Sequence, residues 1–225
     1  MSRALMPRAH VRIAVTDPSG KVVREIEGDV SDGFTQEFLN ILWGMFTFPY
    51  WQGHGGLEIP DAADTLYTFW APGNTLASPF LGWCLFNCPG TPNVVYHVNM
   101  PGVWLYSTPF SPYTYIGINY GALIYDVTYY PPSPSPALGV TPVASYGGTY
   151  QLSVTQMVVN TSGSTKTVTS MALVGALYPF TSGGLSATPI YFGVLYFDLA
   201  ALGESPITWS PAAGITVTVT IQLPT

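Results

Sequence analysis

The sequence predicts an all-β fold, a β-sandwich of jelly-roll type with one short helix, and three observations lead to that prediction. The 225 residues include 23 glycines and 21 prolines, yet 48% are hydrophobic and 14% aromatic. A chain so rich in both turn formers and apolar side chains favours many short strands over disorder. The segment 215–223 alternates strictly between aliphatic residues and Thr or Gln, which is the pattern of a half-buried strand.

The stretch from Tyr150 to Tyr178 predicts a hairpin at the centre of the sandwich. Two runs rich in Val, Thr, Met and Leu flank residues 160–164, which contain Asn, Thr, Ser and Gly. β-Branched residues on both sides of such a cluster are typical of two paired strands and their turn. Since neither run is strongly charged on either face, we expect both faces of the pair to be covered.

The first nine residues predict an extended arm. Residues 1–9 contain Arg3, Pro7 and Arg8 but no alternating pattern and no apolar face. Such a segment gains little by packing on its own domain. We therefore expect this arm to contact another copy of the chain in an assembly.

A hairpin and a helix are predicted for residues 10–48. Residues 10–16 alternate in polarity, Asp-Pro-Ser-Gly at 17–20 has the composition of a turn, and the charged residues 21–27 return as an edge strand. Ser31 or Asp32 is then suited to be a helix N-cap. The apolar stripe of the expected helix consists of Phe34, Phe38, Ile41, Leu42 and Met45.

Residues 50–140 are interpreted as long insertions, rich in Pro and aromatic residues, within a single domain of residues 1–225. Short aromatic runs in this part are each broken by Pro or Gly, so any strands there are expected to be short. Residues 131–136 read Pro-Pro-Ser-Pro-Ser-Pro and predict a stiff connector.

Charged residues are scarce and unevenly distributed. They make up 8% of the chain, against about 25% in ordinary soluble domains. All but four lie in residues 1–64, and the four are Asp126, Lys166, Asp198 and Glu204. A monomer with so neutral a surface tends to associate, so we expect homo-oligomers that form through residues 65–225. A surface kept soluble by hydroxyl groups is the alternative.

The sequence argues against two classes of partner. A net charge of −6 is unlike that of a general nucleic-acid binder. The first 15 residues lack the apolar core of a signal peptide, and no apolar run reaches the length of about 18 residues that a membrane helix needs. We expect no specific nucleic-acid partner and no membrane partner.

Residue types suited to catalysis are scattered. Histidines occur only at His10, His54 and His97, and no nucleophile elbow, phosphate loop or zinc-protease motif is present. Asp126 and Asp198 are candidates for a glycosidase-like carboxylate pair, but we expect them to cap turns or bind backbone amides. The sequence thus predicts no catalytic residues, no enzymatic activity and no cofactor.

Three further patterns each allow two interpretations. His54 with Glu58, Asp61 and Asp64 fits either a calcium-like cation site or a solvated loop with helix-capping acids, and we expect the second. The sequon at Asn160 is a glycosylation pattern that is frequent by chance. Five of the six tryptophans can stack on sugars or pack in the core, and we expect core packing; the five are Trp51, Trp70, Trp83, Trp104 and Trp209.

The two cysteines, Cys84 and Cys88, lie four residues apart. Two cysteines without histidine partners at suitable spacing are too few for a zinc site. A disulfide that closes a small loop and a pair of buried thiols both fit this spacing.

Three segments resemble virion structural proteins of tailed phages and archaeal viruses. They are VRIAVTDPSGKVVREIEGDVSDGFTQEFLNIL (11–42), VTQMVVNTSGSTKTVTSMALVG (154–175) and PITWSPAAGITVTVTIQLP (206–224). The first combines strand, turn, strand and helix, the second is a hairpin with a polar tip, and the third is a turn followed by an alternating strand. The resemblance implies a β-sandwich subunit of a capsid or tail, with no catalytic signature.

Together these expectations describe a structural subunit of a virus particle that assembles with other copies of itself and with other virion proteins. Its expected location is the virion. Two alternatives stay open: a prokaryotic extracellular filament or cell-surface subunit, and a carbohydrate-binding module.

Overall fold

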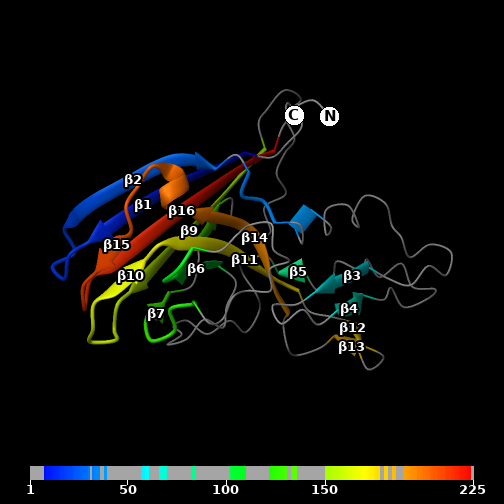
Figure 1. Cartoon of the computed structure of the whole chain (residues 1–225). Helices are drawn as coiled ribbons and strands as arrows, with labels where there is room; N and C mark the ends of the chain where they lie inside the picture. The colour runs from blue at the N-terminus through cyan, green and yellow to red at the C-terminus, as the bar shows by residue number, and fades with distance from the viewer. Residues whose placement is uncertain are drawn as a thin grey trace.

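The computed structural model of the chain (Figure 1) is an all-β protein, which confirms the predicted fold class. The structure describes residues 8–30, 32–35, 38–39, 57–60, 66–69, 83–84, 102–109, 122–130, 133–135, 150–177, 180–181, 184–185 and 190–223. Within these ranges the helical residues are 38–39 and one 3₁₀ turn, η2 (Ala200–Leu202). None of them forms a helix that is long and apolar enough to cross a membrane.

The larger sheet has six strands and contains both the first and the last strand of the chain. Its order is β2-β1-β16-β9-β7, and β8 also pairs with β9. All of these pairs are antiparallel. The strands are β1 (Arg8–Thr16), β2 (Val22–Val30), β7 (Thr128–Tyr129), β8 (Ser133–Ser135), β9 (Tyr150–Val159) and β16 (Gly214–Leu223).

The smaller sheet has four strands in the order β14-β11-β5, and β6 also pairs with β11. Two short segments extend it through isolated bridges, Phe34 with Leu195 and Leu123 with Tyr106. The strands are β5 (Trp83–Cys84), β6 (Gly102–Tyr106), β11 (Ser170–Leu177) and β14 (Ile190–Asp198). The backbone of β5 therefore places Cys84 in the smaller sheet.

Three two-stranded ribbons complete the described strands. Their pairs are β10 with β15, β3 with β4, and β12 with β13. The strands are β3 (Leu57–Pro60), β4 (Leu66–Phe69), β10 (Lys166–Val168), β12 (Phe180–Thr181), β13 (Gly184–Leu185) and β15 (Ile207–Trp209).

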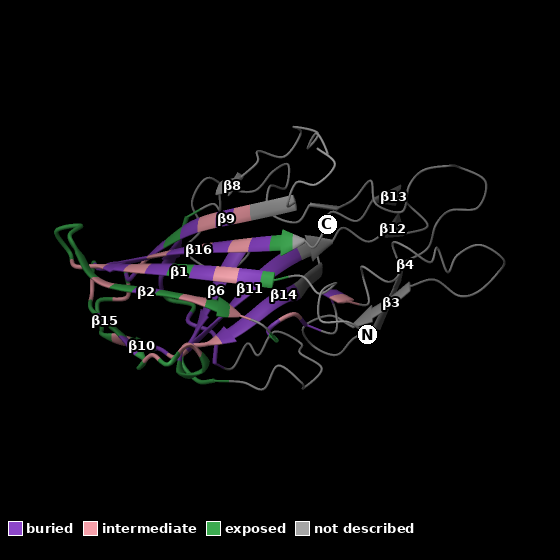
Figure 2. Ribbon diagram, turned by 90° about the horizontal axis from the view of Figure 1, so that it is seen from above, coloured by how far each residue is buried: buried purple, intermediate pink, exposed green. Residues whose placement is uncertain are grey.

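Side chains from both main sheets form one hydrophobic core, and the larger sheet lies over β14, β11 and β6 in Figure 1. The strands β1, β9 and β16 of the larger sheet bury alternate residues, as β1 does with Val11, Ile13 and Val15 (Figure 2). The smaller sheet differs, because every residue of β6 and residues 170–175 of β11 are buried. The larger sheet therefore has one face toward solvent, whereas the smaller sheet is covered on both faces.

The hairpin β1–β2 is confirmed, and its turn follows from Asp17. One carboxylate oxygen of Asp17 accepts hydrogen bonds from the Ser19 hydroxyl at 2.6 Å and from the N–H groups of Ser19 and Lys21 at 2.9 and 3.1 Å. The Ser19 hydroxyl is the main cause that lowers the pKa of Asp17. Gly20 adopts a φ of 85°, a conformation that glycine reaches without strain.

The central hairpin predicted for residues 150–178 is wrong, although both of its runs are strands. β9 pairs with β16 in the larger sheet, whereas β11 pairs with β14 and β6 in the smaller sheet. Residues 160–169, which include β10 of the β10–β15 ribbon, therefore carry the chain from one sheet to the other. Coverage of both faces also holds only for β11, because Met157 of β9 is 43% exposed.

The helix predicted after residue 30 begins later than expected. Phe34 lies in the bridge with Leu195, and the N–H of Thr35 donates to the carbonyl of Val194 at 3.2 Å. These residues are therefore extended and add to the edge of the smaller sheet. The backbone of this segment forms its hydrogen bonds with β14 instead of within a helical turn.

Thr35, rather than Asp32, occupies the N-cap position of the helical residues. Its hydroxyl accepts a hydrogen bond from the N–H of Phe38 at 3.1 Å, which is the bond that an N-cap makes. The rings of Phe34 and Phe38 still stack, with 5.8 Å between their centroids. The remainder of the predicted stripe, from residue 41 onward, lies outside the described residues.

The arm predicted for residues 1–9 is shorter than expected, because β1 begins at Arg8. Arg8 and Ala9 pair with β16, and Ala9 is 1% exposed in the core. Both residues therefore belong to the larger sheet. Arg3 and Pro7 lie outside the described residues.

Parts of residues 50–140 contribute to the main sheets instead of forming insertions. β6 belongs to the smaller sheet with all of its side chains buried, and β7 pairs with β9 at the edge of the larger sheet. The predicted connector 131–136 contains β8, which also pairs with β9. Pro134 is compatible with this position, because proline is tolerated on edge strands.

Candidate functional site

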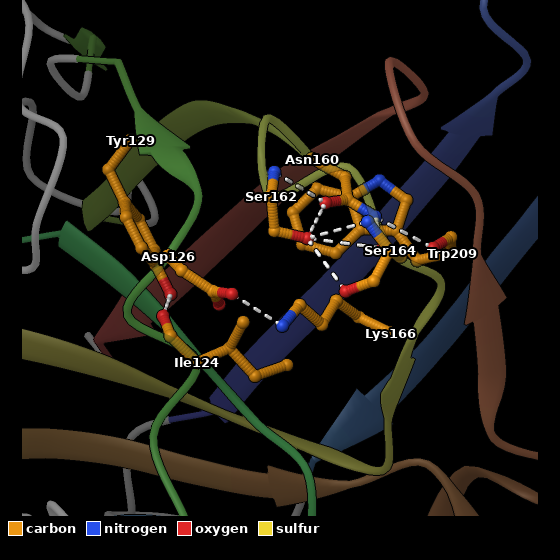
Figure 3. A network of polar contacts seen from close by, with 8 residues as sticks. All are labelled: Ile124, Asp126, Tyr129, Asn160, Ser162, Ser164, Lys166 and Trp209. Atoms are coloured by element: carbon orange, nitrogen blue, oxygen red, sulfur yellow. Dashed lines mark hydrogen bonds and ion pairs between the residues drawn. The ribbon is translucent and has the colours of Figure 1, made fainter.

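The two carboxylates considered for catalysis bind different partners within the chain. Asp126 Oδ2 lies 2.6 Å from Lys166 Nζ (Figure 3), and this hydrogen bond is the main cause that lowers the pKa of Asp126. Asp198 Oδ1 accepts a hydrogen bond from the N–H of Ala200 at 2.9 Å and so starts η2. Asp198 thus binds a backbone amide as expected from the sequence, whereas Asp126 differs from that expectation because it forms an ion pair with a lysine.

Glu204 is also bound, because Arg24 of β2 reaches over to the segment after η2. Arg24 Nη2 lies 2.8 Å from Glu204 Oε2 and donates to the carbonyl of Ser205 at 2.8 Å, while Nη1 donates to the carbonyl of Pro206 at 3.2 Å. This guanidinium fastens the edge strand β2 to the connection between β14 and β15. All four charged side chains of residues 65–225 therefore have a partner inside the chain.

The loop between β9 and β10 is organised by Asn160, which is fully buried. Its Nδ2 donates to the carbonyls of Ser164 and Trp209 at 2.8 and 2.9 Å, and its Oδ1 accepts from the N–H and the hydroxyl of Ser162 at 3.2 and 2.7 Å (Figure 3). Its main-chain N–H donates to the carbonyl of Ala213 at 3.0 Å. Asn160 therefore ties this loop to the β15–β16 turn.

The same geometry removes the glycosylation interpretation of the sequon. Glycosylation requires an accessible Nδ2, whereas Asn160 is 0% exposed and its Nδ2 donates to the carbonyls of Ser164 and Trp209. The sugar-stacking interpretation also loses two of its five tryptophans. Trp104 and Trp209 are both 0% exposed and pack in the core, so neither ring presents a face to a ligand.

Gln156 bridges the two sheets from the inward face of β9. It is 1% exposed; its Oε1 accepts a hydrogen bond from the N–H of Val103 in β6, and its Nε2 donates to the carbonyl of Tyr130 at 2.8 Å. Gly102 has a φ of 144° beside this amide, where a Cβ would collide with the Gln156 side chain. Close approach and backbone conformation both require glycine there.

Tyr129 makes a second polar connection inside the core. Its hydroxyl donates to the carbonyl of Ile124 at 3.0 Å and accepts from the N–H of Leu105 at 3.3 Å. Burial raises the pKa of Tyr129 well above its ordinary value. The hydroxyl thus stays protonated and joins the segment before β7 to β6.

The solvent-facing side of the larger sheet, which we call the outer face, carries rows of hydroxyl groups. Across β9 and β16 the hydroxyl oxygens of Thr155 and Thr218 lie 2.9 Å apart, as do those of Ser153 and Thr220. These side chains are half-buried. This part of the outer face is therefore neutral and polar.

Charged side chains occupy the other half of the outer face, on β1 and β2. Arg12 Nη2 lies 3.1 Å from Glu25 Oε1. His10 Nδ1 lies 2.8 Å from Asp29 Oδ1, and its Nε2 lies 2.9 Å from Glu27 Oε1. The alternating pattern of the predicted hairpin placed these side chains on one face. Which of them form pairs depends on the register of the two strands, which the structure gives.

The structure leaves most of the predicted cation cluster untested. Glu58 lies in β3, of which only the backbone is described, and His54, Asp61 and Asp64 lie outside the described residues. Cys88 also lies outside the described residues, so the disulfide and the pair of buried thiols both remain open. Among the side chains that are described, no group of three His, Cys, Asp or Glu residues is placed to hold a metal ion.

Sequence reasoning did not single out Gln156, and it considered Asn160 only as a sequon and not as the buried residue that organises a loop. A signal was present, because Gln156 shares its face of β9 with aliphatic residues.

Comparison of the chain with protein-family models, with characterised proteins and with solved structures finds no match.

Proposed function

We propose that the chain is a structural subunit of a virus particle, a capsid or tail component, that assembles with copies of itself through residues 65–225. The observation that carries this proposal is the neutral surface of that part. Its four charged side chains are Asp126, Lys166, Asp198 and Glu204, and each is bound within the chain. Because these charges are already bound within the chain, they contribute little repulsion between neighbouring copies.

The physical argument concerns desolvation. A contact between subunits removes surface groups from water, and charged groups resist this far more than neutral ones do. Exposed residues in this part, such as Thr167 and Thr208 of the β10–β15 ribbon, carry hydroxyl groups that can bond across a contact. Such a surface favours repeated contacts between copies, as a shell or a tube requires.

We further propose that the two main sheets form a β-sandwich of jelly-roll type. Support comes from the common core and from the connections that cross between the sheets, as residues 160–169 do. Other copies and other virion proteins are then the expected partners, and the virion is the expected location.

Electron microscopy and sedimentation velocity of the purified full chain test this function. Closed shells or tubes support it, an open fibre favours a filament subunit instead, and dispersed monomers at high concentration contradict it.

A charge introduced on the neutral surface gives a second test. We expect Thr208→Lys to reduce the assembled fraction several-fold, whereas Val23→Lys, at a position 60% exposed on the charged strand β2, leaves assembly unchanged.

A further inference from the structure

His10 lies between two carboxylates at the edge of the larger sheet. Its Nδ1 is 2.8 Å from Asp29 Oδ1 and its Nε2 is 2.9 Å from Glu27 Oε1. An ionised carboxylate can only accept hydrogen bonds, whereas neutral imidazole carries a single N–H. Both contacts are therefore hydrogen bonds only when both ring nitrogens are protonated and the ring is an imidazolium.

The other groups around the ring are one neutral residue and the two arginines of β1. Across β1–β16 the neighbour of His10 is Thr220, which is uncharged. On β1 itself Arg12 is already bound to Glu25, and Arg8 lies opposite Gln222. His10 is thus the cation that the structure places against both Glu27 and Asp29.

We propose that His10 acts as a pH-sensitive clasp that holds β2 onto β1 while the ring is charged and loosens this pairing when the ring loses its proton. Neutral His10 can donate a hydrogen bond to only one of the two carboxylates. Glu25, Glu27 and Asp29 occupy alternate positions on one face of β2 and repel one another when a counter-charge is lost. Among the described strands β2 pairs only with β1, and its further anchor is Arg24, which binds residues 204–206.

The direction of the effect follows from linkage. The hydrogen bond with Asp29, ahead of opposing desolvation and the bond with Glu27, raises the pKa of His10 above its ordinary value of 6.5. A raised pKa in the folded state means that the stabilisation is fully present below pH 6.5 and is lost as the pH rises through the folded pKa. Because these groups are exposed, added salt weakens the effect.

NMR spectra of the full chain with ¹⁵N-labelled histidine measure the protonation of His10 directly. The variant His10→Gln assigns its signals, since they are missing from that spectrum. We expect a titration midpoint above 6.5 that moves downward with salt. A midpoint at or below this value overturns the proposal, whether or not the variant folds.

Hydrogen exchange of the segment that contains β2, corrected for the intrinsic pH dependence, measures the clasp itself. We expect exchange in β2 to become several-fold faster as the pH rises through the midpoint of His10. Arg12→Gln is the matched control, because it removes an ion pair from the same face but no group that titrates in this range, and it should retain the pH dependence. His10→Gln should abolish it. Exchange in β2 that does not change with pH in the unaltered chain overturns the proposal.

Discussion

Gln156 shows how one polar side chain connects the two layers of an apolar core. Replacing it with Met keeps a similar volume but leaves the buried N–H of Val103 without its acceptor and the carbonyl of Tyr130 without its donor. An unsatisfied buried group costs about 1–3 kcal/mol. We expect Gln156→Met to lower the free energy of unfolding by about 2–3 kcal/mol in urea denaturation.

The control for this prediction is Thr155→Val on the opposite face of the same strand. Thr155 shares a hydrogen bond with Thr218 on the half-buried outer face, where water can replace the lost partner. We expect a change within about 0.5 kcal/mol. Equal effects of the two substitutions would contradict the role assigned to Gln156.

Ala212 carries backbone strain in the β15–β16 turn, because its φ is 61°. A left-handed backbone costs a non-glycine residue about 1–2 kcal/mol, so glycine at this position relieves strain. Glycine also gives the unfolded chain more conformational freedom, which offsets up to about 1 kcal/mol of the relief. We expect Ala212→Gly to raise the free energy of unfolding by up to about 1 kcal/mol. The neighbouring buried residue gives the control, since Ala213→Gly removes a packed methyl group and should lower stability in the same melting experiment.

At the scale of elements, Asn160 holds the connection between β9 and β10 against the β15–β16 turn. Asn160→Asp keeps the shape of the side chain but places a carboxylate oxygen against the carbonyls of Ser164 and Trp209. We expect a loss of about 3 kcal/mol or more near neutral pH, because an acceptor faces acceptors in a buried site.

The same substitution has a defined pH dependence. Burial and the facing carbonyls raise the pKa of the new carboxyl above its unfolded value of about 3.9. Stability is therefore regained as the pH falls through this raised pKa, and urea unfolding at several pH values measures it. Ser162→Ala keeps the amide and serves as control, with a small and pH-independent loss. A pH-independent effect of Asn160→Asp would contradict the geometry of this loop.

Local signals predicted individual strands well, but they did not predict which strands pair. The alternation of β16 and the turn at Asp17 are properties of neighbouring residues, so the sequence was sufficient for both. The partner of β9 depends on Asn160 and on a turn some fifty residues further along the chain, which no local pattern contains. The candidate site residues show the same difference. The sequence predicted that Asp198 binds a backbone amide, whereas the pairing of Asp126 with Lys166 could be seen only in the folded structure.

Across the whole molecule, charge and sheet architecture are linked. The larger sheet has an outer face whose charged half lies on β1 and β2, and the smaller sheet buries both of its faces. Exposed charge therefore concentrates near one edge of the larger sheet. The hydroxyl-lined half, on β9 and β16, is the part of this face that suits contacts between copies.

The N-terminal segment gives the last prediction, which concerns assembly rather than folding. Because β1 begins at Arg8, removal of residues 1–7 leaves every described strand pair intact. We expect the thermal unfolding of this truncated chain to match that of the full chain, while its assembled fraction in sedimentation velocity falls several-fold. Seven extended residues span at most about 24 Å, which is enough to reach across a contact and place Arg3 on a neighbour.

Removal of residues 1–9 is the matched control, because it also deletes Arg8 and Ala9. Ala9 is buried and pairs with Ile221 and Val30, so its loss exposes the core at the start of β1. We expect this longer deletion to lower the free energy of unfolding by about 1–2 kcal/mol in addition to its effect on assembly. Normal assembly after removal of residues 1–7 would show that the segment takes no part in contacts between copies, whatever the longer deletion does to stability.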